Sequence, residues 1–83
     1  MDKVFSLSII SADKVIYKGS IFSLVVPAKL GYLGVLANHA PFVSLLAPGK
    51  ASFKEASGQA KTVILESSGF LEILNNQATL LLG

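Results

Sequence analysis

Hydrophobic and polar residues alternate along most of this chain with a period of two residues. Phe5, Leu7 and Ile9 fall on one side of this pattern, and Ser6 and Ser8 fall on the other. Successive side chains of a β-strand point to opposite faces, so the period indicates strands with one buried face. No segment carries the long apolar stripe, with a period of about 3.6 residues, that marks an amphipathic helix.

Turn-forming residues interrupt the alternation about every 8–12 residues, as in all-β sandwiches and barrels. Gly19 separates the second predicted strand from the third, and Pro27 marks the end of the third. Ser57-Gly58 and Asn75-Asn76 are predicted to form hairpin turns, because glycine and asparagine tolerate a positive φ. The segments predicted as strands are 4–10, 15–17, 20–26, 32–36, 42–46, 50–55, 61–66, 69–74 and 77–82.

The pattern therefore predicts one all-β domain, residues 1–83, with eight or nine short strands in two packed sheets. Hydrophobic residues make up 52% of the chain and charged residues only 14%, whereas an average domain has about 25% charged residues. The chain has no cysteine, so no disulfide stabilises it. So small and apolar a domain predicts an exposed hydrophobic surface that a partner covers, with an unusually rich core as the alternative.

The charges argue against a nucleic-acid partner. The net charge is only +2, the seven basic residues are lysines scattered from Lys3 to Lys61, and arginine, the preferred reader of phosphates and bases, is absent. The chain also contains no apolar run of the roughly 18 residues that a membrane-spanning helix needs. We expect the protein to be soluble, or to be attached to a membrane only through a partner.

The segment Gly31-Tyr-Leu-Gly-Val-Leu-Ala-Asn-His-Ala-Pro41 contains the only histidine of the chain. Gly31 and Gly34 can adopt a positive φ or allow another backbone to approach closely. His39 has no second histidine or cysteine with which to share a metal ion. We interpret the segment as a shaped loop that presents a surface, with a satisfied core histidine as the alternative for His39.

Catalytic chemistry is not indicated. The five carboxylates do not stand at spacings typical of an acid/base pair or a metal site, and phosphate-binding glycine motifs are absent. The sequence therefore predicts no catalytic, cofactor-binding or metal-binding residues.

The same loop resembles the signature of the epsilon subunit of rotary F-type ATP synthases, called delta in mitochondria. The Gly-x-Leu-Gly sequence at 31–34, the short turn after it and His-Ala-Pro at 39–41 occur in the same order as in that family's signature. Other segments are similar to family elements in the same order: Leu7-Ser-Ile-Ile-Ser-Ala-Asp13, Tyr17-Lys-Gly19, Leu46-Ala-Pro-Gly49, Ser68-Gly-Phe-Leu-Glu72 and Asn76-Gln-Ala-Thr-Leu-Leu81.

The resemblance implies a flattened β-sandwich of about ten strands, so the expectation is a sandwich of about 8–10 short strands in two sheets. It implies a non-catalytic central-stalk (rotor) subunit of a proton-transporting ATP synthase. Such a subunit binds the gamma subunit and the c-ring, couples ion-driven rotation to ATP synthesis, and is not a homo-oligomer. The expected location is the cytoplasmic face of the bacterial inner membrane, peripherally, within the complex. Most of the family continues into a C-terminal helical hairpin, so these 83 residues are interpreted as a short form without it.

Residues at matching positions acquire expected roles from the resemblance. The residues expected to contact gamma are Ser11, His39, Ala40 and Pro41. The residues expected to contact the c-ring are Pro27, Ala28, Lys29, Leu30, Gly31 and Tyr32. Tyr32 stands where the family often has an acidic residue, which favours contact through Lys29 and the Tyr32 ring over ionic docking. An ordinary exposed turn is the alternative for this loop.

A different class of function is a free-standing small β-barrel that binds a ligand or a nucleic acid. With five Phe, two Tyr and no Trp or Arg, the chain offers little for stacking on bases. A small enzyme is disfavoured by the missing catalytic motifs.

Overall fold

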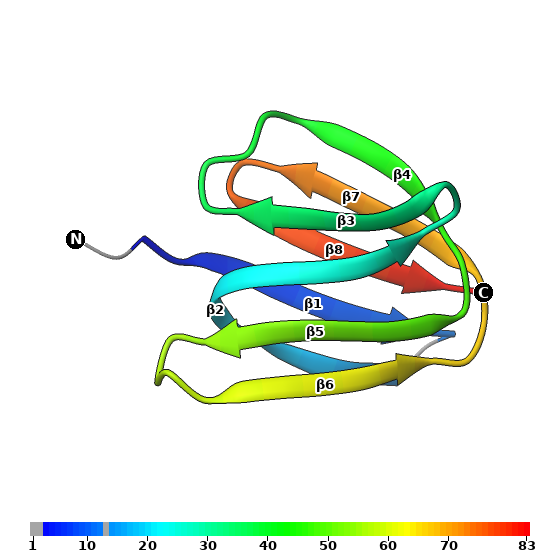
Figure 1. Cartoon of the computed structure of the whole chain (residues 1–83), viewed down its shortest axis with the longest axis horizontal. Coiled ribbons are helices and arrows are strands. Elements are labelled where there is room, and N and C mark those ends of the chain that lie inside the picture. The colour runs from blue at the N-terminus through cyan, green and yellow to red at the C-terminus, as the bar shows by residue number, and fades with distance from the viewer. Residues whose placement is uncertain (1–2, 13) are drawn as a thin grey trace.

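The computed structural model describes residues 3–12 and 14–83. Asp13, the acidic residue of the family-like opening turn, lies outside the described residues. Figure 1 shows strands and no helix in the described part of the chain. The strands are β1 (Phe5–Ser11), β2 (Lys14–Ala28), β3 (Gly31–Leu36), β4 (Phe42–Leu46), β5 (Gly49–Glu55), β6 (Ala60–Leu65), β7 (Gly69–Leu74) and β8 (Gln77–Leu82).

The strands form a β-sandwich of two layers, as predicted, and β2 belongs to both layers. The first layer has the order β4-β7-β8-β1 and ends on the first half of β2. The second layer consists of β3, the second half of β2, β5 and β6. Because β2 passes from one layer to the other, a single hydrogen-bonded network connects both sheets (Figure 1).

The prediction of separate strands at 15–17 and 20–26 is wrong, because β2 runs without a break through Gly19 and Pro27. Gly19 pairs with Leu7 of β1, so the ladder continues across it. Pro27 lacks an N–H but is paired with Tyr32 of β3, and its carbonyl accepts a hydrogen bond of 2.8 Å from the Ala47 N–H. A strand tolerates proline at a position where no backbone N–H is needed for pairing. Pro27 occupies such a position inside β2, and its side chain is buried.

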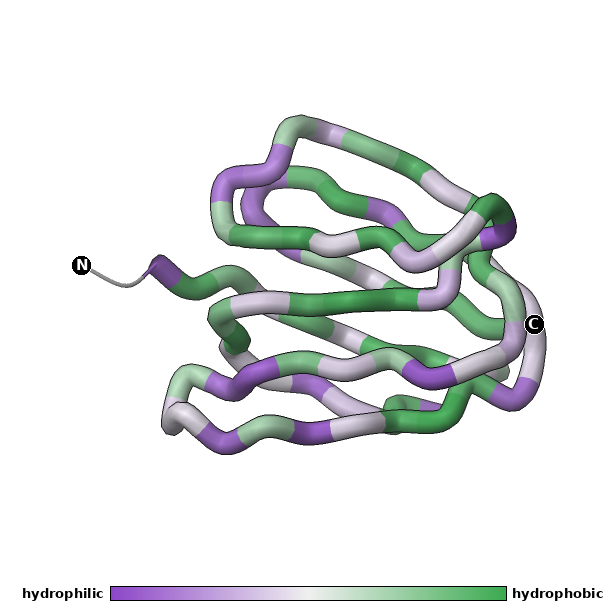
Figure 2. The backbone as a smooth tube through the Cα atoms, in the orientation of Figure 1, coloured by the Kyte–Doolittle hydropathy of each residue, from purple (hydrophilic) through white to green (hydrophobic). Residues whose placement is uncertain are grey.

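The core lies between the two layers and follows the predicted alternation. Phe5, Leu7 and Ile9 of β1 are all buried, as the period of two requires. Figure 2 shows the hydrophobic run in the second half of β2, the strand that both layers share. No polar or charged side chain is buried among the described residues.

The predicted hairpin turns are confirmed. Asn75 and Asn76 have φ values of 51° and 60°, and Gly58 has a φ of 95°. Gly31 also has a positive φ, of 133°, at the start of β3. The expectation for Gly34 is wrong, because its φ is not positive and nothing approaches within 4 Å of the position of a Cβ. Its place in β3 needs no glycine.

Candidate functional site

The outer face of the first layer carries a row of hydrophobic side chains that crosses every strand of that layer. Paired residues of neighbouring strands lie on the same face of a sheet. Successive pairs define this apolar row as Leu45, Phe70, Leu81, Ile10 and Val15. Leu45, Phe70 and Leu81 are 48%, 52% and 46% exposed. An exposed, contiguous set of this kind marks a binding surface.

A second row lies beside the apolar row on the same face. It consists of Val43, Glu72, Thr79, Ser8 and Lys18, again connected by strand pairing. Glu72 and Lys18 are its only charged members, and both are exposed. We call this set the mixed row.

Two hollows open at the β4 end of the apolar row. The larger, of about 490 Å³, is lined by Leu45, Phe70 and Leu81 of the apolar row, together with Lys29 and Gly83 among other residues. The second, of about 430 Å³, lies between β4 and the hairpin that joins β2 to β3. Leu45 and Lys29 line both hollows, so the apolar row continues to the hairpin.

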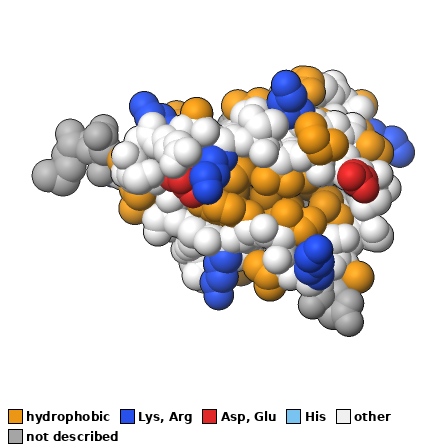
Figure 3. Space-filling view, turned by 90° about the horizontal axis from the view of Figure 1, so that it is seen from below, with side chains coloured by type: hydrophobic (Ala, Val, Ile, Leu, Met, Phe, Trp, Pro, Cys, Tyr) orange, Lys and Arg blue, Asp and Glu red, His pale blue; other side chains and the backbone are white. Residues whose placement is uncertain are grey.

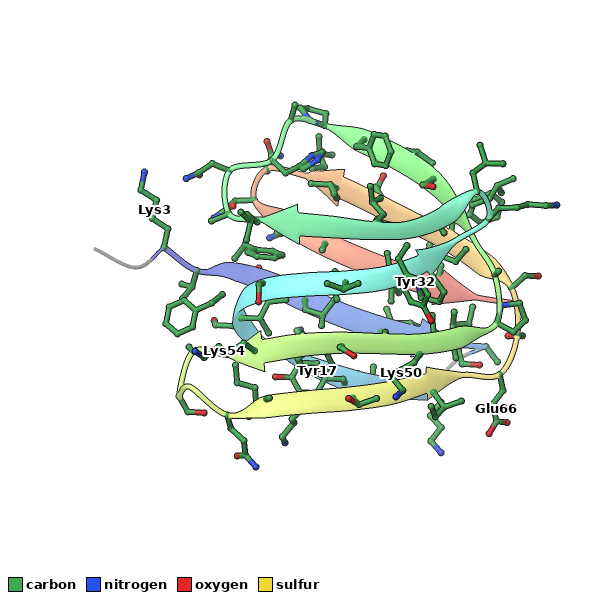
Figure 4. The ribbon with its side chains drawn as sticks, viewed as in Figure 1. Lys3, Tyr17, Tyr32, Lys50, Lys54 and Glu66 are labelled. Atoms are coloured by element: carbon green, nitrogen blue, oxygen red, sulfur yellow. The ribbon has the colours of Figure 1, made fainter. Side chains whose placement is uncertain are left out.

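The β2–β3 hairpin projects from this end of the sandwich. Leu30 at its tip is 102% exposed, and Lys29 and Tyr32 are also exposed. The Lys29 N–H donates a hydrogen bond of 3.0 Å to the Leu45 carbonyl, which ties the hairpin to β4. Figure 4 shows Tyr32 and Lys50 at the same end of the second layer.

The residues predicted to contact a c-ring all belong to this hairpin, but they are not equally accessible. Lys29, Leu30, Gly31 and Tyr32 are exposed, Ala28 is half-buried and Pro27 is buried. Pro27 therefore supports the hairpin from within and is not available to a partner.

The residues predicted to contact gamma do not form one cluster. Ser11 pairs with Leu82 at one end of β8, and its side chain shares the inner side of the sheet with Leu82 at the rim. His39, Ala40 and Pro41 lie in the β3–β4 loop at the other end. Asn38 in that loop contacts Asn76, just before β8. The six residues of β8 separate these two ends of the sheet, which corresponds to about 20 Å.

The loop around His39 owes its shape to asparagines. Asn38 has a φ of 62°, and its N–H donates a hydrogen bond of 2.7 Å to Asn76 Oδ1. Asn76 Nδ2 in turn donates to the Val4 carbonyl at 3.0 Å. His39 is half-buried, with Nδ1 2.7 Å from the Ala40 carbonyl oxygen and its ring 5.6 Å from the Phe42 ring. His39 is therefore not a core histidine. The segment interpreted as a loop is a loop only in part, because its first six residues form β3 and only residues 37–41 connect β3 to β4.

A polar cluster that the sequence did not reveal lies at the open edge between β6 and the first half of β2. The Tyr17 hydroxyl donates a hydrogen bond of 2.6 Å to Glu55 Oε2, and Lys61 Nζ lies 3.5 Å from the same oxygen. The Tyr17 ring also packs on Phe53, with the centroids 4.5 Å apart. Figure 3 shows the hydrophobic side chains at the centre of this edge, with basic and acidic side chains around them.

Burial, followed by the hydrogen bond to Glu55 and its negative charge, raises the pKa of Tyr17 to about 12. A phenol with so high a pKa stays protonated at neutral pH and cannot act as a base. The sequence contained one indication of this cluster, which is the glycine at position 19, two residues after Tyr17 in the same strand. A Cβ at Gly19 would lie 2.7 Å from the Tyr17 hydroxyl, so the glycine makes room for the ring.

Sequence reasoning also missed the apolar row, although it anticipated a hydrophobic surface. The available signal was two unbroken hydrophobic runs, Leu45-Leu46 and residues 80–82. In these runs the outward-facing positions carry hydrophobic residues where the alternation would place polar ones. The described residues contain no group of three or more histidine, cysteine or acidic side chains placed to hold a metal ion. In the same residues, no helix is long and apolar enough to cross a membrane.

The sequence matches a family model described as the β-sandwich domain of the ATP synthase delta/epsilon chain, over residues 4–82. The ATP synthase epsilon chain of Dichelobacter nodosus is 33% identical over 81 residues, which cover 98% of this chain and 56% of the relative. The epsilon chain of Leptospira interrogans serovar copenhageni is 39% identical over 75 residues, covering 90% of this chain and 58% of the relative. The chain thus spans somewhat more than half the length of these relatives.

A solved structure has the same fold. A chain in the mitochondrial ATP synthase of Euglena gracilis, a structure of OSCP, F1 and the c-ring, matches with a TM-score of 0.86 at 21% identity. The match covers 95% of this chain and 50% of that chain. The β-sandwich predicted from the alternation is therefore confirmed.

Proposed function

This chain belongs to the family of ATP synthase delta and epsilon chains, and we propose that it is a non-catalytic central-stalk subunit of a proton-transporting ATP synthase. In this proposal it binds the gamma subunit and the c-ring and couples ion-driven rotation to ATP synthesis. Its place would be peripheral, on the cytoplasmic face of a bacterial inner membrane, within the complex. It would need no cofactor and no active site of its own.

The observation that carries the proposal is the apolar row with the hollow at its β4 end. Leu45, Phe70 and Leu81 expose about half of their surface to water without any neighbour to cover them. Burying apolar surface contributes about 25 cal/mol per Å², and such exposed patches on small domains are commonly covered by a partner. Gamma is the partner that family membership suggests for this face.

His39, Ala40 and Pro41 would then contact gamma at one end of the first layer, and Ser11 would contact it only at the rim of the other end, because its side chain lies on the inner side of the sheet. The β3–β4 loop lies at the β7–β8 turn and Ser11 at the opposite rim, so gamma would have to extend over about 20 Å of sheet. A partner that touches both ends would cover the apolar row between them.

The β2–β3 hairpin would contact the c-ring through Lys29, Leu30 and Tyr32. Gly31, with its positive φ, shapes the tip, while Ala28 and the buried Pro27 hold its base. The hydrogen bond between the Lys29 N–H and the Leu45 carbonyl joins this hairpin to the apolar row. Torque could therefore pass between ring and shaft through β-sheet hydrogen bonds, without a flexible linker.

The test is reconstitution of a synthase that lacks this subunit. Adding the purified chain should restore ATP-driven proton pumping per ATP hydrolysed, and the chain should bind isolated gamma at 1:1 stoichiometry. His39→Ala and Phe70→Ser should weaken binding to gamma, and Lys29→Glu should weaken attachment to the c-ring. Lys54→Glu, the same charge change on the outer side of the second layer, is the matched control.

A chain that folds but neither binds gamma nor restores coupling contradicts the proposed function. Normal binding by His39→Ala and Lys29→Glu would contradict only the roles of these residues.

A further inference from the structure

Within residues 3–12 and 14–83, Glu72 is the only carboxylate on the face that carries the apolar row. It is exposed on β7, pairs with Val43 of β4 and Thr79 of β8, and has Phe70 and Leu74 two residues away on the same side of its strand. The only ion pair among residues 3–12 and 14–83 joins Lys61 to Glu55, so Glu72 has no cationic partner there. The described part of this face thus presents one negative charge in largely hydrophobic surroundings.

Lys18 is the opposite charge on the same face. It ends the mixed row on β2, where it pairs with Ser8 of β1. Three strand spacings separate it from Glu72, which corresponds to about 14 Å. The two charges are too far apart to pair with each other, and both lie on the same side of the apolar row.

We propose that Glu72 and Lys18 set the orientation of gamma on this sheet by pairing with a cation and a carboxylate of gamma, respectively. The inference rests on the proposed function, in which gamma covers the apolar row. The two groups on gamma should stand about 14 Å apart, which on a helix corresponds to about nine or ten residues. A gamma surface rotated by half a turn would place like charges together.

The physical reason is desolvation. A carboxylate covered by an apolar surface loses its water, and without a compensating partner its burial is strongly unfavourable. A partner that covers Phe70 and Val43 must therefore either supply a cation that pairs with Glu72 or leave the Glu72 carboxylate accessible to water. Charged pairs of this kind contribute more to specificity and orientation than to total affinity.

The experiment measures equilibrium binding of the purified chain to the gamma subunit by calorimetry, at low and high salt. We expect Glu72→Lys to weaken binding by about a hundredfold, and Glu72→Gln and Lys18→Glu by about tenfold. The salt dependence should become smaller in Glu72→Gln, because one screened charge pair is removed. Glu66→Lys in the β6–β7 loop and Lys54→Glu on β5 make the same charge changes away from this face and should bind within about twofold of the unaltered chain.

A second readout locates the pair on gamma. Zero-length carbodiimide coupling in the complex should join Lys18 to a gamma carboxylate, and Lys54 should give no such product. Thermal unfolding identifies any variant that fails to fold, and Glu72→Gln, nearly the same in shape, remains informative if Glu72→Lys does not fold.

The outcomes separate this inference from the proposed function. No binding of gamma by the unaltered chain contradicts the proposed function. Binding that Phe70→Ser weakens but that Glu72→Gln, Glu72→Lys and Lys18→Glu leave within twofold overturns the inference alone.

Discussion

The Tyr17 hydroxyl donates a 2.6 Å hydrogen bond to Glu55 Oε2, and this bond joins the two layers of the sandwich at their open edge. Tyr17 lies in the part of β2 that pairs with β1, whereas Glu55 ends β5 in the second layer. Backbone hydrogen bonds do not connect β6 to this half of β2. The side chains close the edge instead.

Tyr17→Phe should therefore destabilise the fold without removing the ring from Phe53. A hydrogen bond to a carboxylate contributes about 1.5–3 kcal/mol, and partial exposure reduces this, so we expect a loss of about 1–2 kcal/mol in the free energy of unfolding. Urea unfolding measures it. Tyr32→Phe removes a hydroxyl from an exposed ring and is the control, expected within about 0.5 kcal/mol. Equal values for the two variants would show that the Tyr17 hydrogen bond does not stabilise the fold.

The stability should also fall at alkaline pH, between about pH 10 and pH 12. The pKa of Tyr17 is about 12 in the folded chain and 10.0 for an ordinary tyrosine. Below pH 10 both states keep the proton, so the contribution is fully present. As the pH rises from 10 to 12 the unfolded state loses its proton first, and stability decreases.

The check is a spectroscopic titration of the phenolate in Tyr32→Phe, which leaves Tyr17 as the only tyrosine. In the folded variant the Tyr17 phenol should titrate near pH 12, and in the denatured variant it should titrate near pH 10. A single midpoint near 10 under both conditions would contradict the environment described for Tyr17. In Tyr17→Phe, the part of the alkaline decline that Tyr17 causes should disappear.

Asn76 should matter more than its neighbour Asn75, although both have a positive φ. Asn76 accepts a hydrogen bond from the Asn38 N–H and donates one to the Val4 carbonyl. Asn76→Gly keeps the left-handed backbone accessible but removes both bonds, so we expect a loss of about 1–2 kcal/mol. Asn75→Gly is the matched control and should be nearly neutral.

Chemical denaturation of both variants tests this, together with binding of gamma. If the β3–β4 loop contacts gamma, Asn76→Gly should weaken binding as well, because the loop that presents His39 loses its anchor. A stability loss at Asn75→Gly as large as that at Asn76→Gly would contradict the role of the side chain.

Gly69→Ala should be among the most damaging single changes in the chain. A Cβ at Gly69 would overlap the Leu81 carbonyl oxygen and lie 2.9 Å from Leu82 Cα, and both belong to the paired backbone of β8. A backbone that cannot move aside makes the cost about 3 kcal/mol or more. No heavy atom lies within 4 Å of a Cβ placed at Gly34, so Gly34→Ala should cost less than about 1 kcal/mol in the free energy of unfolding. Thermal unfolding of the two variants distinguishes them, and similar melting temperatures would contradict the close approach of β7 and β8.

Much of the fold was open to prediction from the sequence, because strand periodicity is a local property. The buried side of β1 follows from the alternation of Phe5, Leu7 and Ile9, and the turn at Asn75-Asn76 follows from residues that tolerate a positive φ. The ordered glycine, asparagine and His-Ala-Pro positions were enough to indicate the family. These features depend on neighbours in the sequence, so no knowledge of distant contacts was needed.

Tertiary structure alone decided the features that carry the candidate site. The continuity of β2 through Gly19 and Pro27 depends on pairing with β1 and β3, which local breaker residues cannot reveal. Leu45, Phe70 and Leu81 form a row only because the registers of β4, β7 and β8 align them, and Tyr17 meets Glu55 across 38 residues. Strand register is a property of pairs of distant segments, so the alternation within each strand determined which side chains face outward but not which outward side chains meet.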